Sequence, residues 1–159
     1  MLKTITLVVF LLLISPFYVS ANPAPKFELA SRNGTVSLDT LKGKIIYLDF
    51  WASWCGPCRK SFPWMNEIQA KYEKDGFVVL AINLDKKRKH ADEFLAETPA
   101  NFTIAFDPSG KTADDYQVMG MPTSYIIDRT GEIKASHIGF LTKDQTKLED
   151  SIKTILGEQ

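Results

Sequence analysis

The chain has 159 residues, of which 45% are hydrophobic and 24% are charged. This composition is ordinary for a globular protein, and the length suits one domain with a sizeable core. Lysine and arginine total 19, as do aspartate and glutamate, so the net charge is zero. The charge balance therefore gives no support to nucleic acid or another strongly charged partner.

The first 21 residues have the pattern of a secretory signal peptide. Lys3 supplies a short positive region, residues 4–14 form a nearly unbroken apolar run, and small residues follow at Val19, Ser20 and Ala21. The apolar run is shorter than the ~20 residues of a membrane-spanning helix. We predict cleavage after Ala21, which leaves residues 22–159 as one periplasmic domain; an uncleaved membrane anchor is the alternative.

Two short strands are expected first in the domain, at residues 27–29 and 35–38. Asn33-Gly34 lies between them and is a hairpin signal, because both residues tolerate positive φ. Residues 45–50 follow as a strand that is apolar on both alternations except at Asp49. This pattern is typical of a central strand covered by helices on both faces.

A helix is expected from Cys58 to about residue 74, because apolar side chains recur on one face. Further on, the sequence predicts a strand, a helix, a strand and a short helical turn, at residues 77–84, 86–98, 102–106 and 113–116. A hairpin of residues 123–128 and 132–138 precedes a last helix, which a Thr142–Gln145 capping box would open. The alternation of strands and helices predicts an α/β fold, with a mixed sheet between helices.

The only two cysteines, Cys55 and Cys58, are separated by Gly56-Pro57. A disulfide across so short a loop adds little stability, so a reactive pair that exchanges disulfides with another protein explains it better. The positive end of the following helix favours a thiolate at Cys55 and lowers the pKa from ~8.5 towards ~7. We expect an exposed, partly ionised Cys55 to attack a partner's disulfide and Cys58 to resolve the mixed disulfide.

Metal binding is the competing interpretation of the cysteine pair. A tetrahedral site would need two more ligands, and only His90 and His137 are available, at no recognised spacing. We therefore expect neither a metal nor another cofactor. A copper carrier that uses both cysteines and His137 remains an alternative function.

Three further positions are candidates for the site. Asp49 interrupts an apolar strand, where burial would raise the pKa of the carboxyl and let it take a proton from Cys58; the alternative is a partly solvated side chain at a strand end. Trp54 would give an apolar rim for a docking partner, whereas packing is favoured for Trp51. Met121-Pro122-Thr123 begins a strand pattern after a glycine.

The sequence around these residues resembles the exported thioredoxin-fold proteins of the TlpA/ResA/CcmG group. The similarity covers nearly all of residues 22–159 and is most specific at Asp49-Phe50-Trp51-Ala52-Ser53-Trp54-Cys55-Gly56-Pro57-Cys58-Arg59 and Gly120-Met121-Pro122-Thr123. It implies a thioredoxin fold with an N-terminal β-hairpin, and a helix–strand insertion within residues 85–116. Two positions differ from the group: Ser61 replaces a frequent glutamate, and Asp49 replaces a frequent asparagine.

The resemblance also implies roles for single residues. A cis Met121–Pro122 bond would face the cysteines, with Pro122 part of the catalytic site and the Met121 backbone pairing with a substrate strand. The substrate-binding surface would comprise Trp54, Gly56, Pro57, Met121 and Thr123.

The function implied is thiol–disulfide exchange with protein disulfides, by a monomer that an inner-membrane carrier of the DsbD/CcdA type recharges with electrons. Gly56-Pro57 resembles the dipeptide of thioredoxin, whose potential lies near −270 mV, against about −120 mV for the oxidant DsbA. We therefore expect a reductase, for which cytochrome c maturation is one possible role. A disulfide oxidase or isomerase is the alternative.

Overall fold

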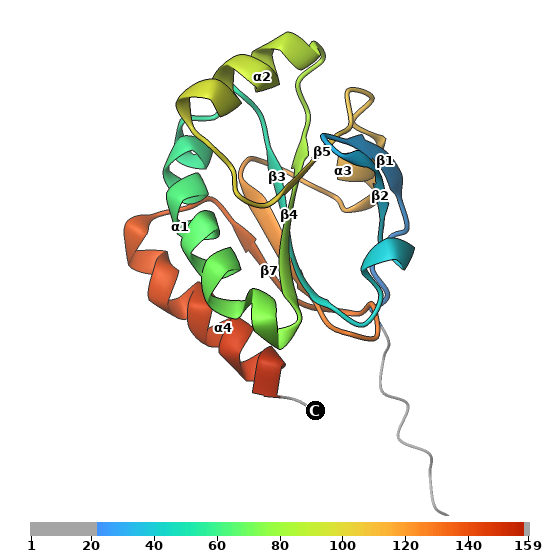
Figure 1. Cartoon of the computed structure of the whole chain (residues 1–159), viewed down its shortest axis with the longest axis vertical. Coiled ribbons are helices and arrows are strands. Elements are labelled where there is room, and N and C mark those ends of the chain that lie inside the picture. The colour runs from blue at the N-terminus through green and yellow to red at the C-terminus, as the bar shows by residue number, and fades with distance from the viewer. Residues whose placement is uncertain (1–21, 158–159) are drawn as a thin grey trace, which may run out of the picture.

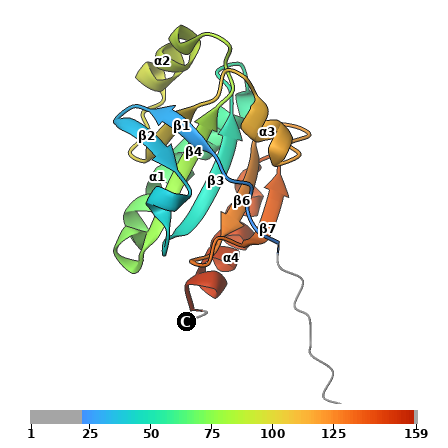
Figure 2. The same cartoon turned by 90° about the vertical axis from the view of Figure 1, so that its right-hand side faces the viewer.

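The computed structural model describes residues 22–157, and the predicted signal peptide lies outside this range. The described residues form one mixed sheet of seven strands in the order β2-β1-β5-β4-β3-β6-β7 (Figures 1 and 2). The strands are β1 (Glu28–Ser31), β2 (Gly34–Ser37), β3 (Ile45–Trp51), β4 (Phe77–Asn83), β5 (Thr103–Phe106), β6 (Thr123–Ile127) and β7 (Ile133–Ile138). The sheet and the N-terminal hairpin confirm the predicted fold class.

Helices cover both faces of the sheet, as the sequence predicted. They are α1 (Gly56–Tyr72), α2 (Arg88–Glu97), α3 (Lys111–Asp115) and α4 (Gln145–Gly157). Figure 1 shows α1, α2 and α4 on one side and α3 on the other. The side chains of α1, α2 and α4 share one apolar cluster, and those of α3 belong to a second. The expected insertion corresponds to α2 and β5, because β5 lies between β4 and the hairpin strand β1.

Strand β3 lies between β4 and β6 in the sheet, leads into the segment that contains Cys55, and is buried along its whole length. It pairs in parallel with β4 and antiparallel with β6. Because side chains alternate between the faces of a strand, Ile45, Tyr47 and Trp51 pack on the α1 side, and Ile46, Leu48 and Phe50 on the α3 side. Asp49 therefore belongs to the α1 face.

The predicted starts of all four helices differ from the structure, by two residues in α2 and α3 and for identifiable local reasons in α1 and α4. Helix α1 begins at Gly56 rather than Cys58, because Cys55 caps it and Pro57 is tolerated in the first turn. The Thr142–Gln145 capping box does not form. Residues Thr142–Asp144 make a 3-10 turn instead, and the Leu141 N–H donates to the Asp144 carboxylate over 3.0 Å.

None of the helices within residues 22–157 combines the length and the apolar character needed to cross a membrane.

Candidate active site

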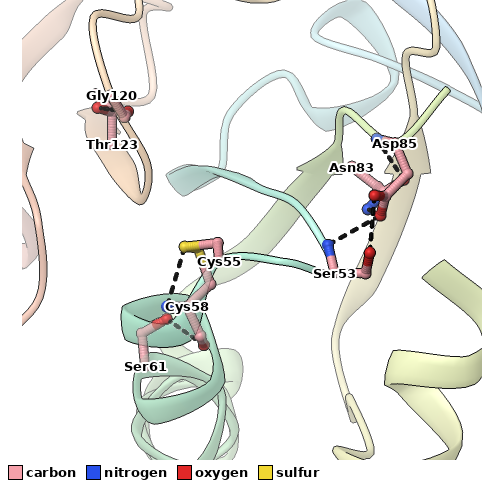
Figure 3. The surroundings of a disulfide bond; sticks show 8 residues. All are labelled: Ser53, Cys55, Cys58, Ser61, Asn83, Asp85, Gly120 and Thr123. Atoms are coloured by element: carbon pink, nitrogen blue, oxygen red, sulfur yellow. Dashed lines mark hydrogen bonds between the residues drawn. A yellow bond between two sulfur atoms is a disulfide. The ribbon is translucent and has the colours of Figure 1, made fainter. Parts of the chain in front are cut away.

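Cys55 and Cys58 are joined in a disulfide at the start of α1, with their Cα atoms 5.3 Å apart (Figure 3). Cys55 is the N-cap residue, and its Sγ accepts a hydrogen bond from the Cys58 N–H over 3.2 Å. This is the interaction that would stabilise a thiolate at Cys55 in the reduced protein, together with the positive end of the helix.

The expected exposure of Cys55 is wrong for this disulfide form. Cys55 is 5% exposed, because its side chain packs into the cluster beneath α1, and Cys58 is completely buried. Gly56 and Pro57 between them are exposed, and Trp54 just before them is 72% exposed. A partner therefore reaches the pair over the surface of residues 54–57, and reaches Cys55 before Cys58.

Hydrogen bonds fix the loop that carries Cys55 to the end of β4. The backbone N–H and the hydroxyl of Ser53 donate to the two carboxylate oxygens of Asp85 over 2.9 and 2.8 Å. The Asn83 side-chain amide donates to the same carboxylate over 2.7 Å (Figure 3). The three residues lie together because parallel neighbours β3 and β4 end at one edge of the sheet.

The sequence interpretation missed Ser53, Asn83 and Asp85. A signal for them exists, since polar side chains that follow adjacent parallel strands meet at the carboxyl edge of the sheet. Using it would have required the order of the strands, which the sequence pattern alone does not give.

Asp49 lies on the α1 face of the sheet and is 1% exposed. Burial raises the pKa of its carboxyl well above the ordinary value, as the sequence predicted. Its Oδ2 atom has no hydrogen-bond partner among the described residues. A partly solvated position at a strand end, the alternative considered above, is wrong.

The segment before β6 contains a cis bond between Met121 and Pro122. Met121 packs against the cluster that contains both cysteines. The buried Thr123 hydroxyl donates to the Gly120 carbonyl over 2.6 Å and holds this turn (Figure 3). Within residues 22–157 the Met121 backbone forms no hydrogen bond with another residue, so its donor and acceptor remain available.

The tryptophans divide as expected between surface and core. Trp51 is fully buried and packs edge-on against Phe62, with ring centroids 4.9 Å apart, whereas Trp54 is exposed.

Ser61 stands where the resembling group often has a glutamate. It is buried, and its hydroxyl donates a hydrogen bond to the Cys58 carbonyl over 3.0 Å.

The two histidines lie on separate elements, His90 in α2 and His137 in β7. Within the described part of the chain, no group of three or more histidine, cysteine, aspartate or glutamate side chains is placed to share a metal ion.

Comparison with known proteins agrees with this geometry. The AhpC/TSA family matches residues 21–136. A thiol-disulfide oxidoreductase ResA from Oceanobacillus iheyensis is 35% identical over 147 residues, which is 89% of this chain and 76% of that protein. The Bacillus cereus ResA is 36% identical over 123 residues, or 77% and 71% of the two chains.

Solved structures agree as well. A crystal structure of a Chlorobium tepidum protein, provisionally named thiol:disulfide interchange protein DsbE, has a TM-score of 0.85 at 53% identity and covers 86% of this chain and 97% of its own. A solution structure from Bacteroides thetaiotaomicron, provisionally named a protein disulfide isomerase, has a TM-score of 0.78 at 27% identity, covering 87% and 90% of the two chains. The chain thus belongs to the AhpC/TSA family and, with its Cys55–Cys58 pair, is a thiol–disulfide oxidoreductase of the ResA/DsbE type.

Proposed function

We propose that the protein is an exported reductase of protein disulfides, in which Cys55 is the nucleophile and Cys58 the resolving thiol. The observation that carries the assignment is the hydrogen bond from the Cys58 N–H to the Cys55 Sγ at the start of α1. It favours negative charge on Cys55 alone, while the complete burial of Cys58 keeps that sulfur from a bulky partner.

The exchange proceeds in two displacements. The Cys55 thiolate attacks one sulfur of the partner's disulfide, which forms a mixed disulfide and releases the other partner sulfur as a thiolate. Cys58 then loses its proton and attacks the Cys55 sulfur, which releases the second partner thiolate and leaves the Cys55–Cys58 disulfide. Two electrons pass from the protein to the partner, whose two thiolates take up protons.

Asp49 is the proposed base for the second displacement. It shares the α1 face of the sheet with the cluster around Cys58, and burial raises the pKa of its carboxyl, which makes the carboxylate a stronger proton acceptor. We expect Asp49→Asn to slow release of the mixed disulfide on the order of 100-fold, the lower end of the usual contribution of a general base, with little effect on the first attack.

Two surface features support binding of an extended protein segment. Trp54 gives an exposed apolar surface beside Cys55, and the Met121 backbone offers a free donor and acceptor next to Pro122. An extended substrate segment would form backbone hydrogen bonds with Met121. Its side chains would then contact Trp54, Gly56 and Pro57. In this arrangement Thr123 acts by holding the turn, since its hydroxyl is bonded to Gly120.

Export and the direction of electron flow rest on the sequence. Residues 1–21 have the signal-peptide pattern, and a reductase outside the cytoplasm needs a dithiol donor that carries electrons across the membrane. We propose a carrier of the DsbD/CcdA type for that step, and apocytochrome c disulfides as one substrate.

Trapping tests the roles of the two cysteines. Cys58→Ser, incubated with a disulfide-bonded protein such as insulin, should accumulate a stable adduct through Cys55 and lose multiple turnover. Cys55→Ser is the matched control and should form no adduct, because the remaining sulfur is buried. Multiple turnover by Cys58→Ser would contradict the two-cysteine scheme.

The equilibrium potential against glutathione tests the direction. We expect a value close to the −270 mV of thioredoxin, which would make the protein a reductant. A value near −120 mV would instead make it an oxidant, and the reductase assignment would fall.

A further inference from the structure

A row of side chains crosses the α1 face of the sheet at the level of Asp49. Asp49 lies opposite Ser124 in the pairing of β3 with β6, and Ser124 lies opposite His137 in the pairing of β6 with β7. Directly paired residues of antiparallel strands point to the same face. The buried carboxyl, the Ser124 hydroxyl and the His137 imidazole therefore follow one another towards the edge of the sheet.

The other directions from Asp49 are apolar or closed. Across β4 its partner is Ala81, and Ala81 is in turn paired with Ile104 of β5. Along β3 the neighbours on the same face are Tyr47 and Trp51, which are both buried. The Tyr47 phenol is hydrogen-bonded to the Ser124 side chain, so this polar group leads back to the same row. Within the described residues, the row through Ser124 is thus the polar direction that leads away from Asp49.

A cavity of about 150 Å³ lies at the far end of this row, between the β6–β7 pair and α4. Ser124 and His137 line it together with Lys147 and Ser151 of α4. The Nε2 atom of His137 is buried without a hydrogen bond, while the side chain as a whole is 26% exposed. Part of the His137 side chain therefore reaches solvent, while its Nε2 atom is enclosed beside Asp144.

We propose that Ser124 and His137, with the cavity beside them, form the route by which Asp49 exchanges its proton with solvent in the resolving step. This proposal rests on the role of Asp49 as the base. Asp49 takes the proton of the Cys58 thiol, Ser124 accepts it from the carboxyl and passes its own hydroxyl proton on, and His137 delivers a proton to solvent. Each group ends the cycle in its starting state.

The charged and titratable groups around the route fit this order. Asp144, in the turn before α4, has its Oδ2 atom 3.5 Å from the His137 Nε2. Lys147 of α4 lines the same cavity as His137, so an acidic and a basic side chain both lie near the end of the route. Burial first, and then the neighbouring Asp49 carboxylate, raise the pKa of the Tyr47 phenol, and its hydrogen bond with the Ser124 side chain opposes them only in part, so Tyr47 stays neutral.

Single-turnover kinetics test the route. The reduced protein is mixed with a saturating peptide disulfide, and its tryptophan fluorescence follows closure of the Cys55–Cys58 bond. In dilute buffer, His137→Ala should slow the resolving step roughly five- to tenfold, a part of the 10²–10⁴-fold contribution of general acid–base catalysis. Added imidazole should restore the rate, because it replaces the missing proton acceptor. His90→Ala removes the exposed histidine of α2 and serves as the matched control.

Further variants separate a proton route from a structural role. Ser124→Ala should slow the same step and Ser124→Thr, which keeps the hydroxyl, should not. In Cys58→Ser, which reports only the first attack, His137→Ala should change nothing. The equilibrium potential should also stay unchanged, because the route alters a rate and not the end states.

The outcomes distinguish this inference from the role of Asp49. If Asp49→Asn slows the resolving step but His137→Ala leaves it unchanged in dilute buffer, the route is wrong and the base assignment stands. If His137→Ala slows the step equally on the Asp49→Asn background, the two residues act independently, which also overturns the route. If Asp49→Asn itself has no effect, the assignment of Asp49 fails and the route with it.

Discussion

Asp49 combines two properties that oppose each other at the scale of a single residue. It is buried in the α1 face of the sheet, where an ionised carboxylate is costly, and its Oδ2 has no hydrogen-bond partner among the described residues. The same burial raises the pKa of the carboxyl, which is the direction that the proposed role as a proton acceptor requires. The residue is therefore expected to help the reaction and to lower the stability of the fold.

The contribution of Asp49 to the stability of the folded protein depends on pH. Since burial raises the pKa of Asp49 above the ordinary value of 3.8, the folded protein holds the proton in a pH range where the unfolded chain has released it. The contribution of Asp49 to the free energy of unfolding therefore falls as the pH rises from 3.8, and levels off above the folded-state pKa.

Asp49→Asn should remove this pH dependence. Because the buried carboxylate is costly once it is ionised and the amide carries no charge, we expect the variant to be more stable than the wild type at mildly alkaline pH. The two proteins should converge towards acid pH. Urea unfolding of the oxidised forms over a pH series measures the difference; a variant of equal or lower stability throughout would contradict the burial argument.

The active-site loop and the end of β4 behave as one unit at the scale of elements. Asp85 accepts three hydrogen bonds, two from Ser53 and one from the Asn83 amide, and so joins the loop after β3 to the loop after β4. These bonds fix the chain at Ser53, two residues before Cys55, which is the N-cap of α1.

Asp85→Ala should destabilise the protein by roughly 2–3 kcal/mol, because it leaves the Ser53 N–H and the Asn83 amide without their acceptor. Ser53→Ala is the matched control: it removes only the hydroxyl and should cost about 1 kcal/mol. Denaturant unfolding of both variants in the oxidised state gives the comparison. Equal losses would mean that the backbone bond to Asp85 contributes little.

At the scale of the whole molecule, the features that short stretches of sequence determine could be predicted from the sequence. The hairpin at Asn33-Gly34, the buried strand around Asp49 and the reactive Cys55–Cys58 pair follow from turn chemistry, periodicity and spacing. The family resemblance added the cis bond before Pro122, which no local pattern would have justified.

The features that depend on contacts between segments far apart in the sequence could not be predicted from it. The meeting of Ser53 with Asp85 requires the parallel pairing of β3 with β4, and the row from Asp49 to His137 requires the register of three strands. Register between strands far apart in sequence is set by packing of the whole sheet. The burial of Cys55 was missed for the same reason, since the cluster that covers it draws on several elements.

The central claim is that the start of α1 makes Cys55, and not Cys58, the reactive thiolate. Alkylation of the reduced protein with iodoacetamide over a pH series, read by mass spectrometry, tests it most directly. The account predicts that Cys55 reacts first, with a pKa below the ordinary cysteine value of ~8.5, while Cys58 stays protected. A Cys55 that titrates at ~8.5 or above, or a Cys58 that reacts as fast, would contradict it.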